Sequence, residues 1–290
     1  MIPDTLIKET VIELLRKAST KLPTDVEEAL KKAFDAEEKD VARMQLSAII
    51  ENIRLAEQMS TPMCQDTGVP IFYVDMGKVK TETIEKAIRD GVVEATKVVP
   101  LRPNAVHPIS RKNPGDNVGR DMPYVNFSMS DHDYLEITVM PKGAGSENMS
   151  ALKMLTPSEG LKGIKSFILD TIVKAGGKPC PPIIVGVGIG GSSDIAAKLA
   201  KKALLRPITE RHTEKEIAQL ETELLEALNM TGIGPMGLGG KTTVLGVNVE
   251  YAYCHTASLP VAVNIQCWAG RRATARIYEN GKVEFVTQRS

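Results

Sequence analysis

The sequence predicts a mixed α/β fold, with a helical layer at the amino terminus, a central mixed sheet and a strand-rich final third. In residues 4–60 the apolar side chains recur with a period near 3.6, which is typical of amphipathic helices. From residue 69 onward, short apolar or alternating runs are bounded by Gly, Pro and Asn, which is typical of strands and turns. A chain of 290 residues that is 42% hydrophobic can bury a large core. We therefore treat residues 1–290 as a single domain whose helical portion covers about residues 1–60.

The elements before residue 124 follow from local signals. Pro62 ends the third helix of the first segment, and residues 69–75 form an apolar strand, so Cys64–Gly68 is predicted to lie in a helix-to-strand turn. Residues 81–99 are predicted to be helical. From Pro100 to Pro123 the chain is rich in Pro, Asn, Gly and Arg. This loop is longer than usual connections, and long ordered loops are commonly functional.

Two alternating runs, 124–129 and 134–140, are joined by four polar residues and predict a β-hairpin with a solvated His132 in its turn. Residues 142–148 are predicted to form a glycine loop. Thr156, Pro157 and Glu159 supply an N-cap, a first-turn proline and a capping carboxylate, which predicts a helix to about Ala175. The remaining predicted elements are a strand at 182–188, a helix from Gly190, a helix from Thr213 to Met230, and strands at 244–251, 259–267, 273–278 and 283–286.

Charge and composition exclude several classes of protein. Lys plus Arg and Asp plus Glu both number 36, so no net field attracts nucleic acid or an anionic membrane. The amino terminus lacks the pattern of a signal peptide, and no run of eighteen apolar residues is present. We expect a cytoplasmic protein that binds neither nucleic acid nor membrane, in a reducing compartment where four unevenly spaced cysteines remain thiols.

The four cysteines are Cys64, Cys180, Cys254 and Cys267, and none belongs to a C-x-x-C pair. This spacing excludes a zinc ribbon or a thioredoxin-like site formed within one segment. A lone cysteine usually packs as a small hydrophobic side chain. Cys64 precedes Gln-Asp-Thr-Gly, Cys180 lies between prolines, and Cys267 ends a strand-like run. Any site that these thiols share must therefore be assembled by the fold.

Two glycine motifs resemble nucleotide-binding loops. Gly186–Gly191 matches G-x-G-x-x-G between a strand and a helix, but the next parallel strand with its acidic end is missing at the expected distance. Gly239–Thr242 resembles the end of a Walker A loop, but Pro235 occupies the position of the first glycine and a β-branched run follows. The P-loop interpretation is rejected, and a nicotinamide enzyme stays as a minor alternative.

Several longer motifs in order resemble one family. They are Cys64-Gln-Asp-Thr-Gly68, Leu101–Ala105, Lys142–Asn148, Gly177–Pro182, Gly186–Asp194, Gly232–Thr243, His255–Ser258 and Cys267-Trp-Ala. Together these segments resemble the α subunit of oxygen-sensitive class I fumarase and L-tartrate dehydratase from about residue 40 onward. The resemblance is specific to the family and does not distinguish the two substrates.

The resemblance implies that Cys64, Cys180 and Cys267 hold a 4Fe–4S cluster with one iron lacking a protein ligand, and that Cys254 is a spare thiol. An iron left open can act as a Lewis acid on a substrate oxygen. Asp66 and His255 would then form an acid–base pair. Gln65, Arg102 and Gly143 would bind a small dicarboxylate, and Arg suits a bidentate carboxylate contact. Arg271 and Arg272 would either serve the cluster or pair with surface acids.

In relatives the counterparts of Arg102 and Gly143 come from a neighbouring protomer, which implies a dimeric core. Single-chain members of the family continue into a second domain that supplies a threonine base and further Arg and Lys residues. We therefore expect a separate β subunit, in a dimer of αβ pairs. The expected reaction is the reversible hydration of fumarate to (S)-malate, with L-tartrate dehydration as the alternative. An iron–sulfur electron carrier that uses Cys254 as the fourth ligand is a less favoured alternative.

Overall fold

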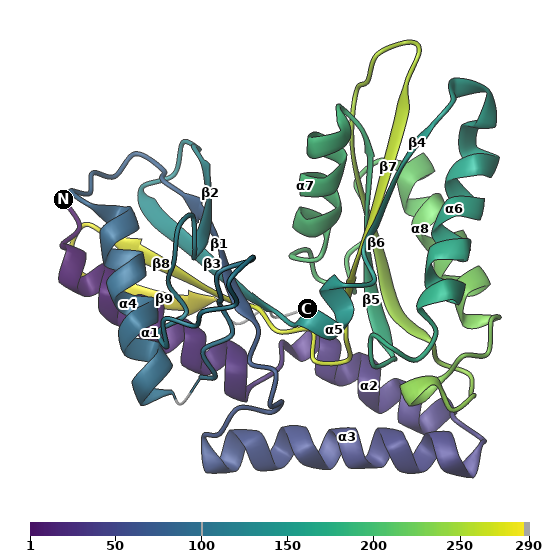
Figure 1. The fold of residues 1–290 in the computed structure, drawn as a ribbon, viewed down its shortest axis with the longest axis horizontal. Helices are drawn as coiled ribbons and strands as arrows, with labels where there is room; N and C mark the ends of the chain where they lie inside the picture. Colours follow the sequence, from purple (N-terminus) through teal and green to yellow (C-terminus); the bar gives the residue numbers. More distant parts are fainter. Residues whose placement is uncertain (100, 287–290) are drawn as a thin grey trace. The chain divides into compact units, whose positions relative to one another are not determined.

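The computed structural model describes residues 1–99 and 101–286 (Figure 1). The chain forms two compact units. Of the described residues, unit 1 comprises Met1–Pro23, Asn52–Gly143 and 271–286, and unit 2 comprises Thr24–Glu51 and Ala144–Gly270. Helix α3 (Asp40–Met59) contributes to both. The mixed α/β class predicted from the sequence is confirmed, and the strands lie in two separate sheets.

Unit 1 is a five-stranded mixed sheet covered by two helices. The elements are α1 (Asp4–Thr20), β1 (Val69–Asp75), α4 (Ile84–Val98), β2 (Tyr124–Ser128), β3 (Tyr134–Lys142), β8 (Ala273–Tyr278) and β9 (Val283–Val286). The strand order is β2-β1-β3-β8-β9. The apolar stripe of α1, which includes Ile7, Val11 and Leu14, is fully buried against α4 and the sheet. Burial of this stripe, as the 3.6-residue period requires, makes the core of the unit.

The hairpin predicted for residues 124–140 is wrong. β2 pairs in parallel with β1, with Ile71 opposite Tyr124, and β3 pairs antiparallel with β1, with Val69 opposite Lys142. β1 therefore lies between the two strands. Alternation of apolar and polar residues indicates a strand but does not specify its neighbour, so a strand from an earlier part of the chain could take the central place.

The predicted turn residue His132 is packed and not solvated. Its ring stacks on Tyr134 with 3.9 Å between ring centroids, and its Nε2 lies 3.3 Å from Asp75 Oδ1. Asp75 also accepts hydrogen bonds from Ser130 Oγ at 2.6 Å and Ser128 Oγ at 3.0 Å. Burial by itself raises the pKa of Asp75, but these hydrogen bonds, that of the Gly77 amide and the nearby His132 outweigh burial and lower the pKa.

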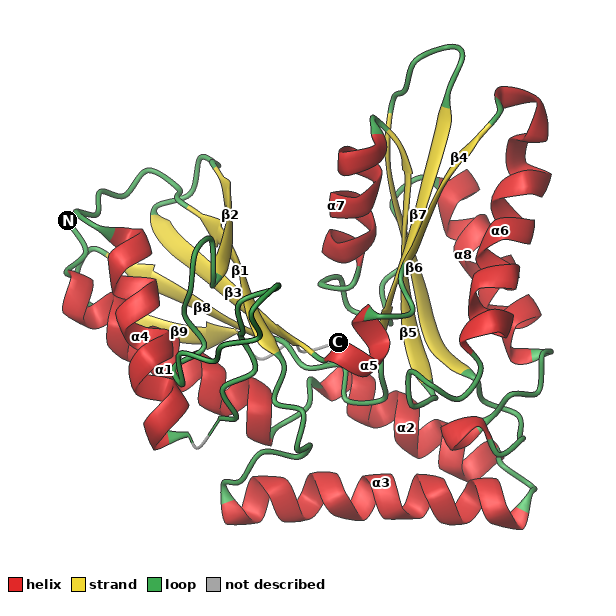
Figure 2. Ribbon diagram, viewed as in Figure 1, coloured by secondary structure: helices red, strands yellow, loops and turns green. Residues whose placement is uncertain are grey.

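Unit 2 is a four-stranded sheet with helices on both faces (Figure 2). Its elements are α2 (Thr24–Ala36), α5 (Ala144–Glu147), β4 (Ala151–Leu155), α6 (Gly160–Ala175), β5 (Ile183–Gly190), α7 (Ser193–Ala203), α8 (Lys215–Asn229), β6 (Val244–Ala252) and β7 (Leu259–Gln266), with 3₁₀ turns at Pro157–Glu159 and Pro235–Gly237. The strand order is β4-β7-β5-β6, and only β5 and β6 are parallel. The capping box of Thr156 and Glu159 is confirmed. The sequence analysis missed the short α5 and β4.

The glycines of the G-x-G-x-x-G motif bring a helix close to the sheet. A methyl group at Gly186 would lie 2.1 Å from the carbonyl oxygen of Ala200, and one at Gly188 would lie 2.0 Å from that of Ala196. Only glycine therefore fits beneath α7 at these two positions. The motif has a packing role inside unit 2, which removes the main observation in favour of a nicotinamide site.

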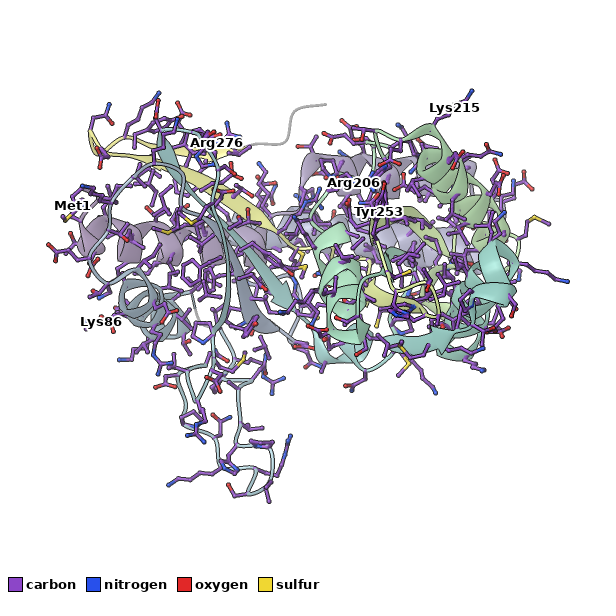
Figure 3. All side chains as sticks on the ribbon, turned by 90° about the horizontal axis from the view of Figure 1, so that it is seen from above. Met1, Lys86, Arg206, Lys215, Tyr253 and Arg276 are labelled. Carbon is purple, nitrogen blue, oxygen red and sulfur yellow. The ribbon has the colours of Figure 1, made fainter. Side chains whose placement is uncertain are left out.

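The outer edge of β6 is closed by side chains instead of by another strand. The fully buried Glu221 accepts the Val249 N–H at 2.8 Å, and Arg206 donates to the Val249 carbonyl at 3.2 Å and forms an ion pair with Glu221 (Arg206 is labelled in Figure 3). Asn229 Oδ1 accepts the Val244 N–H at 2.9 Å. Buried backbone groups need partners, and these side chains supply them.

Among the described residues, no helix is both long enough and apolar enough to cross a bilayer.

Replacing Asp75 with Asn should change the acid dependence of stability. A carboxyl with a lowered folded pKa contributes stability above its unfolded pKa of about 3.9, and that stability is lost as pH falls through the folded value. Urea unfolding between pH 6 and pH 3 should therefore depend less steeply on pH in Asp75→Asn. The exposed Asp131→Asn serves as the control and should follow the parent protein. Parallel curves for Asp75→Asn and the parent would contradict this account.

Replacing Glu221 with Ala should lower the free energy of unfolding by about 3–5 kcal/mol, because Arg206 would lose its buried partner and Val249 N–H its acceptor. The matched control is Glu223→Ala on the same helix, which removes an exposed ion pair with Lys165 and should cost less than about 1 kcal/mol. Denaturant unfolding monitored by circular dichroism measures both. Equal losses of unfolding free energy in the two variants would show that the edge contacts stabilise the fold no more than an exposed ion pair does.

Candidate active site

The predicted turn that carries Cys64 lies in unit 1, between α3 and β1. Its start is held by two hydrogen bonds at Met63: the Met63 N–H donates to the Ser19 carbonyl at 2.9 Å, and Asn52 Nδ2 donates to the Met63 carbonyl at 2.8 Å. Cys64 and Asp66 are half-buried, whereas Gln65 between them is exposed. The turn thus holds its backbone firmly while its side chains remain partly accessible.

Asp66 is fixed at both its carboxylate and its backbone. Its Oδ1 accepts the Gly68 N–H at 3.0 Å and lies 3.4 Å from Asn104 Nδ2. Its backbone carbonyl accepts Arg271 Nη1 at 2.8 Å. A methyl group at Gly143 would lie 3.1 Å from Asp66 Oδ2, so Gly143 passes directly beside the carboxylate. The structure therefore places Gly143 beside Asp66 of the same chain, whereas the resemblance implied that Gly143 comes from a neighbouring protomer.

Arg271 and Arg272, for which the sequence left two roles open, are both buried and do not lie at the surface. Only 1% of Arg271 is exposed, and its Nε has no hydrogen-bond partner among the described residues. A buried guanidinium is costly unless anionic or polar groups surround it. Its place beside Asp66 and Gly143 makes it part of the same cluster.

The segment Arg102–Ala105 is held beside this turn by amide side chains. The buried Asn117 accepts the Asn104 N–H at 2.7 Å and donates to the Arg102 carbonyl at 2.9 Å. Thr67 Oγ1 accepts the Arg102 N–H at 3.0 Å. The Arg102 side chain itself is exposed. The backbone of the predicted carboxylate-binding residue is therefore fixed, while its guanidinium remains accessible to solvent.

In unit 2 the structure brings Cys180 and Cys267 into neighbouring segments. β5 and β7 are antiparallel, with Ile184 opposite Gln266, so Cys180 before β5 and Cys267 after β7 lie at the same end of the sheet. The Trp268 N–H donates to the Cys180 carbonyl at 3.2 Å. Both cysteines are half-buried. A backbone hydrogen bond thus joins the two cysteine segments.

The unit 2 part of the Lys142–Asn148 motif lies at this same end. A methyl group at Gly145 would lie 3.6 Å from the Lys178 carbonyl oxygen, which places α5 against the segment that precedes Cys180. Glu147 forms an ion pair with Lys201 and accepts a hydrogen bond from Asn264 Nδ2 at 3.2 Å. These contacts fix the glycine motif on the sheet.

His255 and Cys254 lie at the other end of the sheet, in the loop between β6 and β7 (Figure 1). Both are exposed, as is Tyr253, which is 93% exposed (labelled in Figure 3). β7 runs from this loop to Cys267, and eight strand residues span about 26 Å. Cys254 therefore cannot be a fourth ligand beside Cys180 and Cys267 of the same unit, which argues against the electron-carrier alternative.

All four cysteines lie in the described part of the chain, and none is in a disulfide bond. Neither unit gathers three or more His, Cys, Asp or Glu side chains as a site for a single ion, within the residues that the structure describes. A 4Fe–4S cluster places a different demand, because each thiolate binds its own iron. Thiolates are the usual ligands of such clusters, so the donor type of Cys64, Cys180 and Cys267 fits this group.

Comparison with known proteins gives consistent results. Residues 8–276 match the family described as "Fumarate hydratase (Fumerase)". The chain belongs to the fumarate hydratase family. A Methanocaldococcus jannaschii protein named "Putative L(+)-tartrate dehydratase subunit alpha" is 56% identical over 283 residues, which cover 96% of this chain and 99% of the relative. The "L(+)-tartrate dehydratase subunit alpha" proteins of Escherichia coli K12 and Shigella sonnei are each 38% identical over 275 residues, which cover 94% of this chain and 91% of theirs.

In this fumarate hydratase family member, the sequence analysis missed the residues that hold the site in place, namely Thr67, Asn104, Asn117 and Arg271. A weak signal was present, since Asn104 and Asn117 both lie in the long loop that was expected to be functional. Asparagine side chains commonly satisfy the backbone of irregular segments.

Replacing Asn117 with Ala should loosen the Arg102–Ala105 segment and lower the free energy of unfolding by about 2 kcal/mol, because the half-buried amides at Asn104 and Ala105 lose their buried acceptor. Hydrogen exchange of the Asn104 amide should accelerate. The control is Asn113→Ala in the same loop, which removes only exposed hydrogen bonds, to the Pro103 carbonyl and from the Gly115 N–H, and should change stability by less than about 0.5 kcal/mol. Unchanged exchange at Asn104 in Asn117→Ala would refute this role.

Proposed function

We propose that this chain is the α subunit of an iron–sulfur hydro-lyase that acts on a small hydroxy-dicarboxylate, and that L(+)-tartrate is a better candidate substrate than fumarate or malate. The observation that carries the proposal is the Trp268–Cys180 hydrogen bond, which joins the segments of two proposed cluster ligands beside α5. The names of the relatives favour tartrate over the fumarate reaction expected from the sequence. Their name "subunit alpha" supports a separate β subunit.

Cys64, Cys180 and Cys267 are the proposed ligands of a 4Fe–4S cluster. When bound, such a cluster with one open iron supplies a Lewis acid for the substrate hydroxyl. Two features of the chain support this assignment. The three thiols are half-buried and outside disulfides, whereas Cys254 is exposed at the far end of its sheet. The buried guanidinium of Arg271 beside the Cys64 turn supplies positive charge where an anionic group would need it.

The remaining roles belong to side chains of this chain. Asp66 would carry a proton to or from the substrate, since its carboxylate is held in one orientation by Gly68 and Asn104. Arg102 would bind a substrate carboxylate through its exposed guanidinium, and Gly143 would offer a backbone N–H near Asp66. Gln65, exposed in the same turn, would contact the substrate. Both carboxylates of a dicarboxylate need hydrogen-bond donors or cations as partners. Preformed donors stabilise the transition state most where negative charge develops.

His255 remains the proposed acid–base partner, and its position supports a site completed by more than one chain. The length of β7 separates its loop from Cys267 within unit 2. A dimer of αβ pairs could supply the His255 loop from one chain to the cluster region of another. The β subunit would supply the remaining base and cationic side chains.

The decisive experiment is anaerobic reconstitution of the chain with iron and sulfide. We expect about four irons per chain, a brown chromophore and an electron paramagnetic resonance signal after reduction. Cys64→Ser, Cys180→Ser and Cys267→Ser should each abolish or strongly reduce iron binding, whereas the matched control Cys254→Ser should retain it. Full cluster content in all three variants would end the proposal.

Activity of the reconstituted chain should depend on its β subunit. The chain alone should turn over at less than about 1% of the rate of the complex, because residues essential for catalysis commonly contribute 10²–10⁴-fold. Comparison of kcat/KM for L-tartrate and for malate distinguishes the two substrates. Full activity of the isolated chain would refute the divided site, and a preference for malate would refute the choice of tartrate.

A further inference from the structure

The two edges of the unit 2 sheet are treated differently. At the β6 edge, Glu221, Arg206 and Asn229 pair with backbone groups of Val249 and Val244. β4 forms the opposite edge, and β7 is its one strand neighbour among the described residues. Proteins usually protect edge strands because unpaired N–H and C=O groups can pair with another strand. The unprotected β4 edge is therefore the place where a further strand can add.

The backbone register shows which groups β4 presents. Met154 lies opposite Pro260, and a proline has no N–H to exchange in a hydrogen-bonded pair. Because such pairs alternate with non-hydrogen-bonded pairs along an antiparallel ladder, Leu152 and Met154 direct their N–H and C=O groups away from β7. The open edge thus offers two sets of donors and acceptors, both at residues with apolar side chains.

The side chains around this edge are accessible. Leu152 is 45% exposed and Met154 is 52% exposed, and the period of two places both on the same face of the sheet. Two large apolar side chains exposed on a five-residue edge strand are the pattern that partner strands cover. Lys153 projects from the opposite face.

A groove of about 750 Å³ runs between β4 and α6 on the Lys153 face. Phe167 and Met149 contribute apolar surface, and Lys153, Lys162, Asp170 and Lys174 contribute charge. Glu159, which also lines the groove, is bound to Thr156 and forms an ion pair with Lys153. Three lysines against two carboxylates leave the groove with an excess of one positive charge, which favours acidic side chains in an occupant.

A second copy of this chain is a poor occupant. Antiparallel pairing of two β4 strands uses both outward-facing residues only when Leu152 of one lies opposite Met154 of the other. Lys153 then lies directly opposite Lys153 of the second copy, in a non-hydrogen-bonded pair where side chains approach most closely. Like charges in this arrangement destabilise the pair. The edge is therefore better suited to a different chain that carries an acidic residue at this place.

We propose that a strand of the β subunit, with an acidic side chain opposite Lys153, adds to the open edge of β4 and lies over the groove beside α6. This proposal rests on the proposed function, which requires a β subunit. β4 begins three residues after α5, and its first residue, Ala151, pairs with Val263 near the Cys267 end of β7. A chain that binds along β4 would therefore reach the end of the sheet that holds Cys180 and Cys267.

The test compares the isolated chain with its complex with the β subunit by hydrogen exchange. The Leu152 and Met154 amides should exchange rapidly in the isolated chain and at least about 100-fold more slowly in the complex, whereas Lys153, whose amide faces β7, should be protected in both. Protection of Leu152 and Met154 by the β subunit supports the proposal. No change at these amides on binding overturns it, even though the complex forms.

A proline at position 154 gives an independent measurement. Met154→Pro removes the outward N–H without disturbing the ladder to β7, and proline is tolerated on edge strands. Its affinity for the β subunit should fall about tenfold, because one backbone hydrogen bond and the Met contact are lost. The matched control Met154→Leu keeps the N–H and should bind within about twofold of the parent.

Two further outcomes are decisive. Equal affinity of Met154→Pro and Met154→Leu for the β subunit would contradict strand addition but leave the hydro-lyase proposal standing. Failure of the parent chain to bind the β subunit at all would overturn both the inference and the divided enzyme. Self-association of the isolated chain that Met154→Pro abolishes would instead identify a second copy as the occupant and overturn the inference.

Discussion

The antiparallel pairing of β5 with β7 is the constraint on which the unit 2 part of the site depends. Cys180 precedes one strand and Cys267 follows the other, so this pairing carries both cysteines to one end of the sheet. A register shift of one residue would invert every side chain of β7. Val261, Val263 and Ile265 would leave the core that they share with α6 and α8 and would point to the opposite face, where the small Ala262 packs against α7. The hydrophobic core therefore holds the cysteine segments in register, and the Trp268–Cys180 hydrogen bond completes the arrangement.

Unit 1 positions its proposed site residues by a different means. Asp66, Arg102 and Gly143 lie in turns and loops, which have no ladder to satisfy their backbone groups. Side chains of Thr67, Asn104, Asn117 and Arg271 do so instead. Such a network favours one arrangement of the loops. A buried donor or acceptor that loses its partner destabilises the fold by more than the hydrogen bond stabilises it when made. The network gives Arg102 a fixed backbone and a solvent-accessible side chain, which is compatible with the proposed binding of a substrate carboxylate.

Several conspicuous motifs have structural roles. Gly186 and Gly188 allow α7 to approach the sheet, and the glycine-rich turn near Gly240 leaves room for the Glu37 carboxylate, which accepts the Lys241 N–H at 2.8 Å. Glycine in both places is required by close approach and not by a phosphate. In the same unit, polar side chains pair with the β6 edge. Among the described residues, no strand pairs with the outer side of β4. This contrast within one sheet is the basis of the proposal that another chain binds at the β4 edge.

The sequence by itself determined which segments are helices and strands wherever the signal is local. The strands Val69–Asp75, Ala273–Tyr278 and Val283–Val286 begin and end where alternation and turn residues predict, and the capping residues before α6 were readable. The motifs also identified the family, because residue identity at many ordered positions is a property of sequence. Tertiary structure alone decided that β1 separates β2 from β3, that Arg271 is buried beside Asp66, and that His255 and Cys267 lie at opposite ends of β7. These features depend on pairing between segments far apart in the chain, and a periodic pattern records that a face is buried without recording which segment buries it.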